Sequence, residues 1–228
     1  MSHFERDYHI QFPNLCSMVV RFPETNSDSM INSVGQSWQQ ISVLRYLLPT
    51  FMRLRQLKII RAPVLFKDKF SREHLASISS FTMTKRCQLT KSHNVPVPSA
   101  FSTTFGSTLQ ALSPEKLTAL RLGASDTTSK TPLIPIDVHF PNLTTLSVEG
   151  FELDAENVAP THTDFAGFII RHRASLDRLA LVDCVLVYSH MHLDVGERVQ
   201  AWVEKVGLSS VVHYQVRSDS LSLSPSWC

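Results

Sequence analysis

Residues 176–186 read Leu-Asp-Arg-Leu-Ala-Leu-Val-Asp-Cys-Val-Leu, an apolar pattern of the form L-x-x-L-x-L-x-x-C-x-L. Leu179 and Leu181 are two residues apart, so on a strand both side chains point to the same side. Leu176 is expected in the turn that leads into this strand. Cys184 falls where a small buried side chain with a weak S–H donor would close the inner turn. The stretch therefore predicts a short strand with one buried face.

The L-x-x-L-x-L spacing recurs along the chain, and the sequence Phe-Pro-Asn-Leu leads into it twice, at 12–15 and 140–143. With a weaker copy at 78–83, the segments start near Leu15, Leu54, Ile78, Leu117, Leu143 and Leu176. Such repetition is the signature of leucine-rich repeats, whose usual period is about 20–29 residues. The starts at 54 and 78, and at 117 and 143, fit that period. The other intervals require longer connecting segments.

Helical patterns lie between the expected strands. Residues 34–48 carry an apolar stripe that Pro49 is expected to end, and Phe165, Phe168, Ile169 and His172 form another after Thr163 and Asp164. A third helix is expected to start at the capping box Asp194-x-x-Glu197, with Val195 as its first apolar residue, and to stop at Gly207. A closing strand is expected at 211–216.

The fold class predicted is α/β, a leucine-rich-repeat solenoid with a short-stranded parallel sheet on the concave side. Helices or loops are expected on the convex side. One domain would span 1–217, with a mobile loop within the Ser/Thr/Pro-rich stretch 92–131, and 218–228 would form a flexible tail.

Composition excludes several classes of protein. The chain has 228 residues, 43% apolar and 18% charged, which argues against global disorder. No apolar run approaches the roughly 18 residues that cross a bilayer, and the charged N-terminus lacks a signal-peptide pattern. Four well-separated cysteines without a CxxC motif favour a reduced environment. We expect a cytoplasmic or nuclear protein that does not bind membranes.

Basic residues are concentrated between positions 53 and 91, where ten Lys or Arg side chains face only Asp68 and Glu73. They are Arg53, Arg55, Lys58, Arg61, Lys67, Lys69, Arg72, Lys85, Arg86 and Lys91. A basic face of this kind attracts nucleic acid or an acidic partner. Few aromatic residues are interleaved to stack bases, so nucleic-acid binding is the second hypothesis rather than the first.

Motifs for catalysis are missing from the sequence. There is no G-x-S-x-G, no P-loop and no G-x-G-x-x-G. His190-x-His192-x-Asp194 is the densest cluster of metal-ligand types, but nothing nearby completes the shell, and Asp194 is better explained as a helix cap. The acidic residues at 149–156 are interpreted as solvated loop charges at a strand exit. We therefore predict no catalytic residue, no metal and no cofactor, and hence not an enzyme.

The concave face of a solenoid is the place where a partner binds. Side chains that alternate with the buried leucines point into it, and they are mostly small and polar, with some basic ones. The candidate contacts are Gln56, Lys58, Thr82, Arg121, Thr145, Ser147, Glu149 and Arg178. Because Arg and Lys project furthest and pair with anions, the expected partner is a protein, acidic or phosphorylated.

The segment 140–188 resembles the repeat region of fungal F-box leucine-rich-repeat proteins. Those proteins carry FP-x-L-x-x-L-x-L and H-x-x-x-L-x-x-L-x-L-x-x-C repeats, matched here from Phe140 and from His172 to Cys184. The resemblance implies the substrate-recognition part of a ubiquitin-ligase receptor. No Leu-Pro-rich F-box segment precedes Phe12, so a ligase scaffold would be a partner only where an F-box lies outside this chain.

Overall fold

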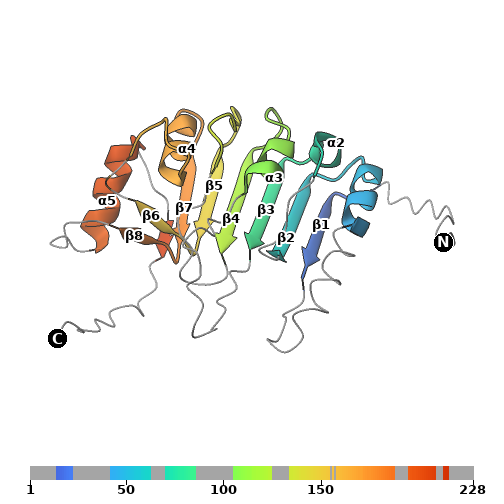
Figure 1. Cartoon of the computed structure of the whole chain (residues 1–228), viewed down its shortest axis with the longest axis horizontal. Helices are drawn as coiled ribbons and strands as arrows, with labels where there is room; N and C mark the ends of the chain where they lie inside the picture. Colours follow the sequence, from blue (N-terminus) through green and yellow to red (C-terminus); the bar gives the residue numbers. More distant parts are fainter. Residues whose placement is uncertain are drawn as a thin grey trace, which may run out of the picture.

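The computed structural model describes residues 14–22, 42–62, 70–85, 105–124, 134–154, 156, 158–187, 195–208 and 213–215. In this part of the chain seven strands form one sheet in the order β1-β2-β3-β4-β5-β7-β9, and every neighbouring pair is parallel (Figure 1). The strands are β1 (Ser17–Arg21), β2 (Gln56–Ala62), β3 (Ser80–Lys85), β4 (Ala119–Ala124), β5 (Thr145–Glu149), β7 (Arg178–Val182) and β9 (His213–Gln215). The α/β class with a parallel sheet is confirmed.

Helices are described in every connection between neighbouring strands of the large sheet except that from β4 to β5, and they gather along one side of the sheet (Figure 1). The first is a short α-helical segment at 42–47, which continues as the 3-10 helix η2 (Leu48–Thr50). The others are α2 (Arg72–Leu75), α3 (Gly106–Ala111), α4 (Phe165–His172) and α5 (Val195–Val206). Their buried side chains belong to the same core cluster as the inward side chains of the strands. The helices therefore cover one face of the sheet. None of the helices described is long and apolar enough to cross a bilayer.

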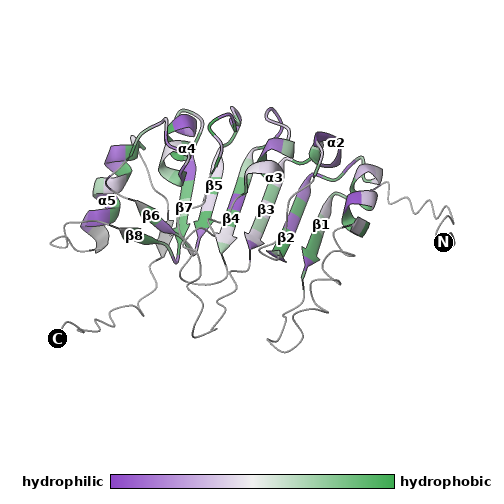
Figure 2. Cartoon of the chain, viewed as in Figure 1, coloured by the Kyte–Doolittle hydropathy of each residue, from purple (hydrophilic) through white to green (hydrophobic). Residues whose placement is uncertain are grey.

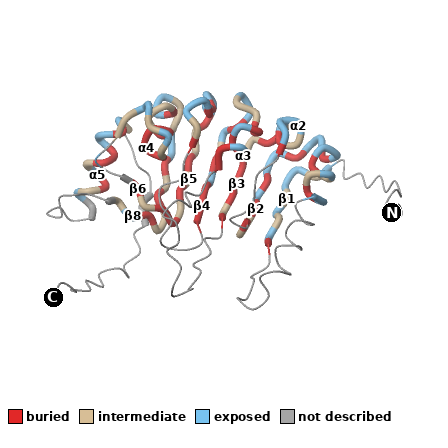
Figure 3. Tube along the Cα trace, in the orientation of Figure 1, coloured by how far each residue is buried: buried red, intermediate tan, exposed pale blue. Residues whose placement is uncertain are grey.

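The strand register reproduces the alignment of the L-x-x-L-x-L segments. The second apolar positions lie opposite one another in one row, and the third positions form a parallel row. The first row is Met18, Leu57, Phe81, Leu120, Leu146 and Leu179, and the second is Val20, Ile59, Met83, Leu122, Val148 and Leu181. From β2 to β7 every member is buried, as predicted (Figure 3). We call these two lines the core rows.

A repeated hydrogen bond joins the turns that precede the strands. In the first five segments the carbonyl just after the first apolar residue accepts two backbone N–H groups from the next segment. Cys16 accepts from Arg55 and Gln56 at 2.9 and 3.0 Å, and Thr144 accepts from Asp177 and Arg178 at the same two distances. Arg55, Ser79 and Thr118 act in the same way in between. This pairing satisfies the turn amides and holds adjacent strands in register.

The segment that follows β5 is not the solvated loop that the sequence predicts. Gly150 has φ +74°, and a Cβ there would lie 2.4 Å from the carbonyl oxygen of Ala124. After this turn, β6 (Glu152–Asp154) pairs in parallel with β8 (Val185–Val187) to form a second, two-stranded sheet. Assigning the acidic residues at 152–154 to a loop was therefore wrong.

Other sequence-based expectations have mixed outcomes. Asp164 caps α4 by accepting from the Gly167 N–H at 2.8 Å, and Gly207, at φ +71°, ends α5, both as predicted. The α-helix described at 42–47 ends just before Pro49, as predicted, and the chain continues through Pro49 as the 3-10 turn η2. Within 92–131, the structure describes α3 and β4. Residues 34–41, 190–194 and 218–228 lie outside the described residues.

Hydropathy follows the same division of the sheet. Apolar residues alternate with polar ones along the strands (Figure 2). The core rows pack with α4 and α5, where Phe168 and Trp202 are fully buried. The predicted stripe on α4 is confirmed as a core-facing surface.

His172 is a buried polar residue in this core. Its Nε2 accepts from the Phe140 N–H at 2.8 Å, while Nδ1 lies 2.7 Å from the Phe168 carbonyl and donates to it. Its ring stacks against that of His139, with centroids 4.9 Å apart. Burial, together with smaller contributions from the charges of His139 and Arg171, lowers the pKa of His172 to about 4, although the bond to Phe168 opposes the shift.

We expect Leu146→Ala to lower the free energy of unfolding by about 2–5 kcal/mol, because Leu146 is fully buried in a core row and its removal leaves a cavity. Ser147→Ala, the next residue on the same strand, faces away from the core and is expected to change stability by less than about 0.5 kcal/mol. Urea denaturation of both variants measures the difference. Equal costs would contradict the assignment of faces.

We expect stability to fall as the pH drops from about 6.5 to about 4, because the unfolded chain takes up a proton at His172 before the folded chain does. Above this window the contribution of His172 is fully present, and it amounts to at most about 3 kcal/mol. His172→Gln should flatten this part of the pH profile. An unchanged slope in that variant, measured by denaturation at several pH values, would show that other groups control it.

Candidate binding surface

The strand side chains that alternate with the core rows lie on the opposite face of the sheet, which we call the outer face. All eight candidate contacts from the sequence lie on it. Gln56, Thr145 and Arg178 lie in one row across the sheet, Lys58, Thr82, Arg121 and Ser147 in the next, and Glu149 in the third. Gln56, Lys58, Arg121 and Arg178 are exposed, and the other four are half-buried.

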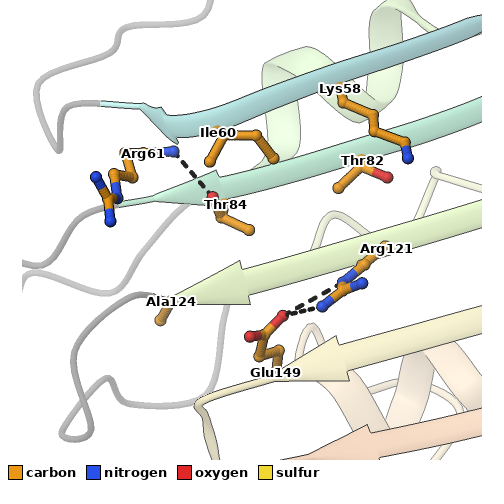
Figure 4. A pocket seen from close by; sticks show the side chains of 8 residues that line it. All are labelled: Lys58, Ile60, Arg61, Thr82, Thr84, Arg121, Ala124 and Glu149. Carbon is orange, nitrogen blue, oxygen red and sulfur yellow. Dashed lines mark hydrogen bonds and ion pairs between the residues drawn. The ribbon is translucent and has the colours of Figure 1, made fainter. Parts of the chain in front are cut away.

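Half of these residues line one hollow of about 340 Å³ on the outer face (Figure 4). Lys58, Thr82, Arg121 and Glu149 are brought together there, whereas Gln56, Thr145, Ser147 and Arg178 are not part of its lining. The remaining lining residues are Ile60, Arg61, Thr84 and Ala124. The hollow thus spans β2 to β5, towards the carboxyl ends of the strands.

The eight candidate contacts did not include the other four lining residues, Ile60, Arg61, Thr84 and Ala124. Arg61 has φ +60°, and the β2–β3 register shifts between Ile59 and Ala62. Its backbone N–H donates to Thr84 Oγ1 at 2.9 Å instead of following the regular ladder. Such an irregularity re-aims side chains at the end of a strand. Nothing in the sequence around Arg61 signals it.

Gly123 leaves space beside the hollow. It lies between Thr84 and Glu149 in the register of β3, β4 and β5. A Cβ at this position would be 2.9 Å from Thr84 Cγ2 and 3.5 Å from the Glu149 side chain. The sequence did contain a signal, because a glycine inside a strand often marks a close approach, and the chain has only seven glycines.

Arg121 and Glu149 form an ion pair across β4 and β5. The Arg121 Nε and Nη2 atoms both donate to Glu149 Oε2, at 3.2 and 2.6 Å (Figure 4). The side chains remain 49% and 29% exposed, so solvent screens the pair. With Lys58 and Arg61 also in the lining, three cations face one carboxylate, and the hollow carries a formal charge of +2.

The basic segment 53–91 does not form a single face. Lys85 is only 2% exposed, and its ammonium lies 5.0 Å from the centroid of the Phe105 ring. The prediction that Lys85 is a surface cation was therefore wrong. Lys85 lies two residues after Met83 and four after Phe81, so its side chain points to the same buried side of β3 as theirs. Arg72 lies on α2, away from the outer face that carries Lys58.

Cys184 has the environment of a structural thiol, as predicted. It is buried, its Sγ donates to the Val148 carbonyl at 3.4 Å, and burial raises its pKa to about 11. Within the described ranges, no three His, Cys, Asp or Glu side chains are grouped as around a metal ion. The cluster His190-x-His192-x-Asp194 lies outside those ranges.

Comparisons with protein-family models, with curated proteins and with solved structures find no match.

We expect the Arg121–Glu149 pair to contribute less than about 1 kcal/mol to stability, because both side chains are partly exposed. A double-mutant cycle with Arg121→Gln and Glu149→Gln, followed by denaturation, measures the coupling. The coupling should shrink further in 1 M salt, where the screening length is about 3 Å. A coupling above about 2 kcal/mol that salt leaves unchanged would show a desolvated pair.

Proposed function

We propose that the chain is a leucine-rich-repeat solenoid and a non-enzymatic module that binds a protein through its outer, concave face. The repeat assignment is supported by the agreement between six aligned sequence segments and the strand register. An L-x-x-L-x-L segment at every strand from β1 to β7 of one parallel sheet is the arrangement this repeat type forms.

The outer face is the observation that carries the binding proposal. The helices pack on the opposite side, so this face presents three rows of side chains to a partner. The rows are mostly small, polar or basic, and their exposed cations include Lys58, Arg121 and Arg178. Arg and Lys at such positions suit an acidic or phosphorylated protein segment, and Arg in particular is enriched at binding hot spots.

The resemblance of residues 140–188 to fungal F-box proteins supports a role as the substrate-recognition part of a ubiquitin-ligase receptor. In that role the repeats would bind the target, and the protein would act in the cytoplasm or nucleus. Recruitment of the ligase scaffold would depend on an F-box outside this chain.

Nucleic-acid binding through 53–91 receives no support from the described basic residues. Arg53 and Arg55 lie in the turn before β2, where they donate to Asn14 and to the Ser77 carbonyl. Lys85 is buried, and Lys58 lies on the outer face. These positions do not form the continuous track that a phosphate backbone requires.

Site-specific crosslinking tests the proposed surface. A photoreactive residue at Ser147, on the outer face, should capture a specific protein from a cell lysate, whereas one at Lys116, in the exposed turn before β4, should not. Lys58→Glu combined with Arg178→Glu should reduce the capture at least about tenfold, because each removes a cationic contact. Neither cation has an ion-pair partner within the described residues, so folding should be retained.

Arg72→Glu combined with Lys116→Glu is the matched control, since it changes the net charge equally away from the outer face. Capture that survives the outer-face variant, or that is lost equally in the control, would exclude the outer face as the binding site.

A further inference from the structure

The hollow contains polar groups that have no protein partner. Lys58 and Thr82 are register partners on β2 and β3, and Thr82 is in turn the register partner of Arg121 on β4 (Figure 4). Within the described part of the chain, neither the Lys58 ammonium nor the Thr82 hydroxyl has a hydrogen bond or ion pair. Both groups are therefore available to a ligand.

Further donors lie next to them. Thr84 Oγ1 accepts from the Arg61 N–H, so its own O–H proton remains available for donation. Arg121 uses Nε and Nη2 for Glu149, which leaves both N–H groups of Nη1 without a partner among the described residues. Lys58, Thr82, Thr84 and Arg121 together present N–H and O–H groups towards the same hollow.

The spacing of these groups suits one compact anion. Neighbouring strands are about 4.8 Å apart, so the backbones of Lys58 and Arg121 are separated by about 10 Å, with Thr82 between them. Side chains of this length can converge on one group above Thr82. A phosphate monoester brings a charge of about −1.5 to −2 and three acceptor oxygens, which the Lys58 ammonium, the Thr82 hydroxyl and the remaining N–H groups of Arg121 can meet. A carboxylate supplies one charge and two oxygens.

We propose that this hollow receives a single phosphate monoester, carried by a phosphoserine or phosphothreonine of a protein partner. Lys58, Thr82 and Arg121 contact the phosphate. The proposal rests on the proposed function, because it assumes that the partner lies on the outer face.

The surroundings of the hollow favour a phosphoprotein over a nucleic acid. Ile60 and Ala124 complete the lining, and Ser147 and Ala180 continue the row beyond Arg121. No aromatic side chain lies on the outer face of β1 to β5 or β7 to stack a base. Among the described strands, only Lys58 and Arg121 of the outer-face cations share a row, and Arg21 and Arg178 lie in the rows on either side of it. These positions do not form one line of cations for successive phosphates.

Titration calorimetry on the full chain tests this inference. The probes are a capped pentapeptide with a central phosphoserine, the same peptide with serine, inorganic phosphate, and a short single-stranded oligonucleotide. The phosphoserine peptide should bind saturably and at least about tenfold more tightly than the serine peptide. Lys58→Met and Thr82→Val should each weaken its binding about tenfold, because each removes a bond to a charged acceptor.

Arg72→Met, on α2, is the control and should leave the binding unchanged. Glu149→Gln should strengthen the binding severalfold, since it removes the negative charge from the hollow, and misfolding cannot cause such a gain. Equal affinity for the serine peptide, or no response to Lys58→Met and Thr82→Val, would overturn the proposal. It would also be overturned if the oligonucleotide bound more tightly than the phosphoserine peptide, or if inorganic phosphate bound and the peptide did not.

The titration contains no protein partner, so its outcome is independent of the crosslinking result. Specific crosslinking at Ser147 without phosphoserine binding would overturn the phosphate site and leave the protein-binding surface intact. Phosphoserine binding without specific crosslinking at Ser147 would leave the phosphate site intact and would contradict the outer face as a protein-binding surface.

Discussion

A carbonyl that accepts two N–H groups from the next segment ties the start of each strand from β1 to β7 of the large sheet to its neighbour. The arrangement recurs from Cys16 to Thr144, always one residue after the first apolar position of the segment. Because strand side chains alternate, a shift by one residue would exchange the buried and exposed faces of a strand. The shared carbonyls prevent this shift at the point where each strand begins. The continuous core rows and the continuous outer face are both consequences of this bond.

Much of the sheet could be predicted because the apolar pattern that defines each strand is short and recurs along the chain. A spacing of two between apolar residues predicts the buried face of a strand, as for Leu57 and Ile59 or for Leu179 and Leu181. One such segment could also belong to a helix, but its repetition along the chain favours strands. The strands β6 and β8 were missed because three residues contain too little of a period to recognise. Their position follows from the turn at Gly150, which depends on contact with the neighbouring strand end.

The candidate site was predictable only in part, for a related reason. Alternation predicts which side chains share the outer face, so Lys58, Thr82, Arg121 and Glu149 could be named from the sequence. Which of them border one hollow depends on the missing side chain of Gly123 and on the positive φ of Arg61. Both are properties of neighbouring strands in contact. Lys85 shows the reverse case. Its alternation with Phe81 and Met83 predicts a side chain that points into the core, and only the abundance of basic residues in 53–91 suggests a surface position.

The order of the strands in space, from β1 to β9, is the order of their synthesis. Each new strand of the large sheet pairs with the strand of that sheet made just before it, so assembly can proceed as the chain leaves the ribosome without waiting for a distant segment. At every stage only the latest strand presents an unpaired growing edge. Lengthening or shortening a connection between two strands therefore alters neither the register already formed nor the register still to come, which is how intervals as different as those between Leu15, Leu54 and Ile78 fit into one sheet.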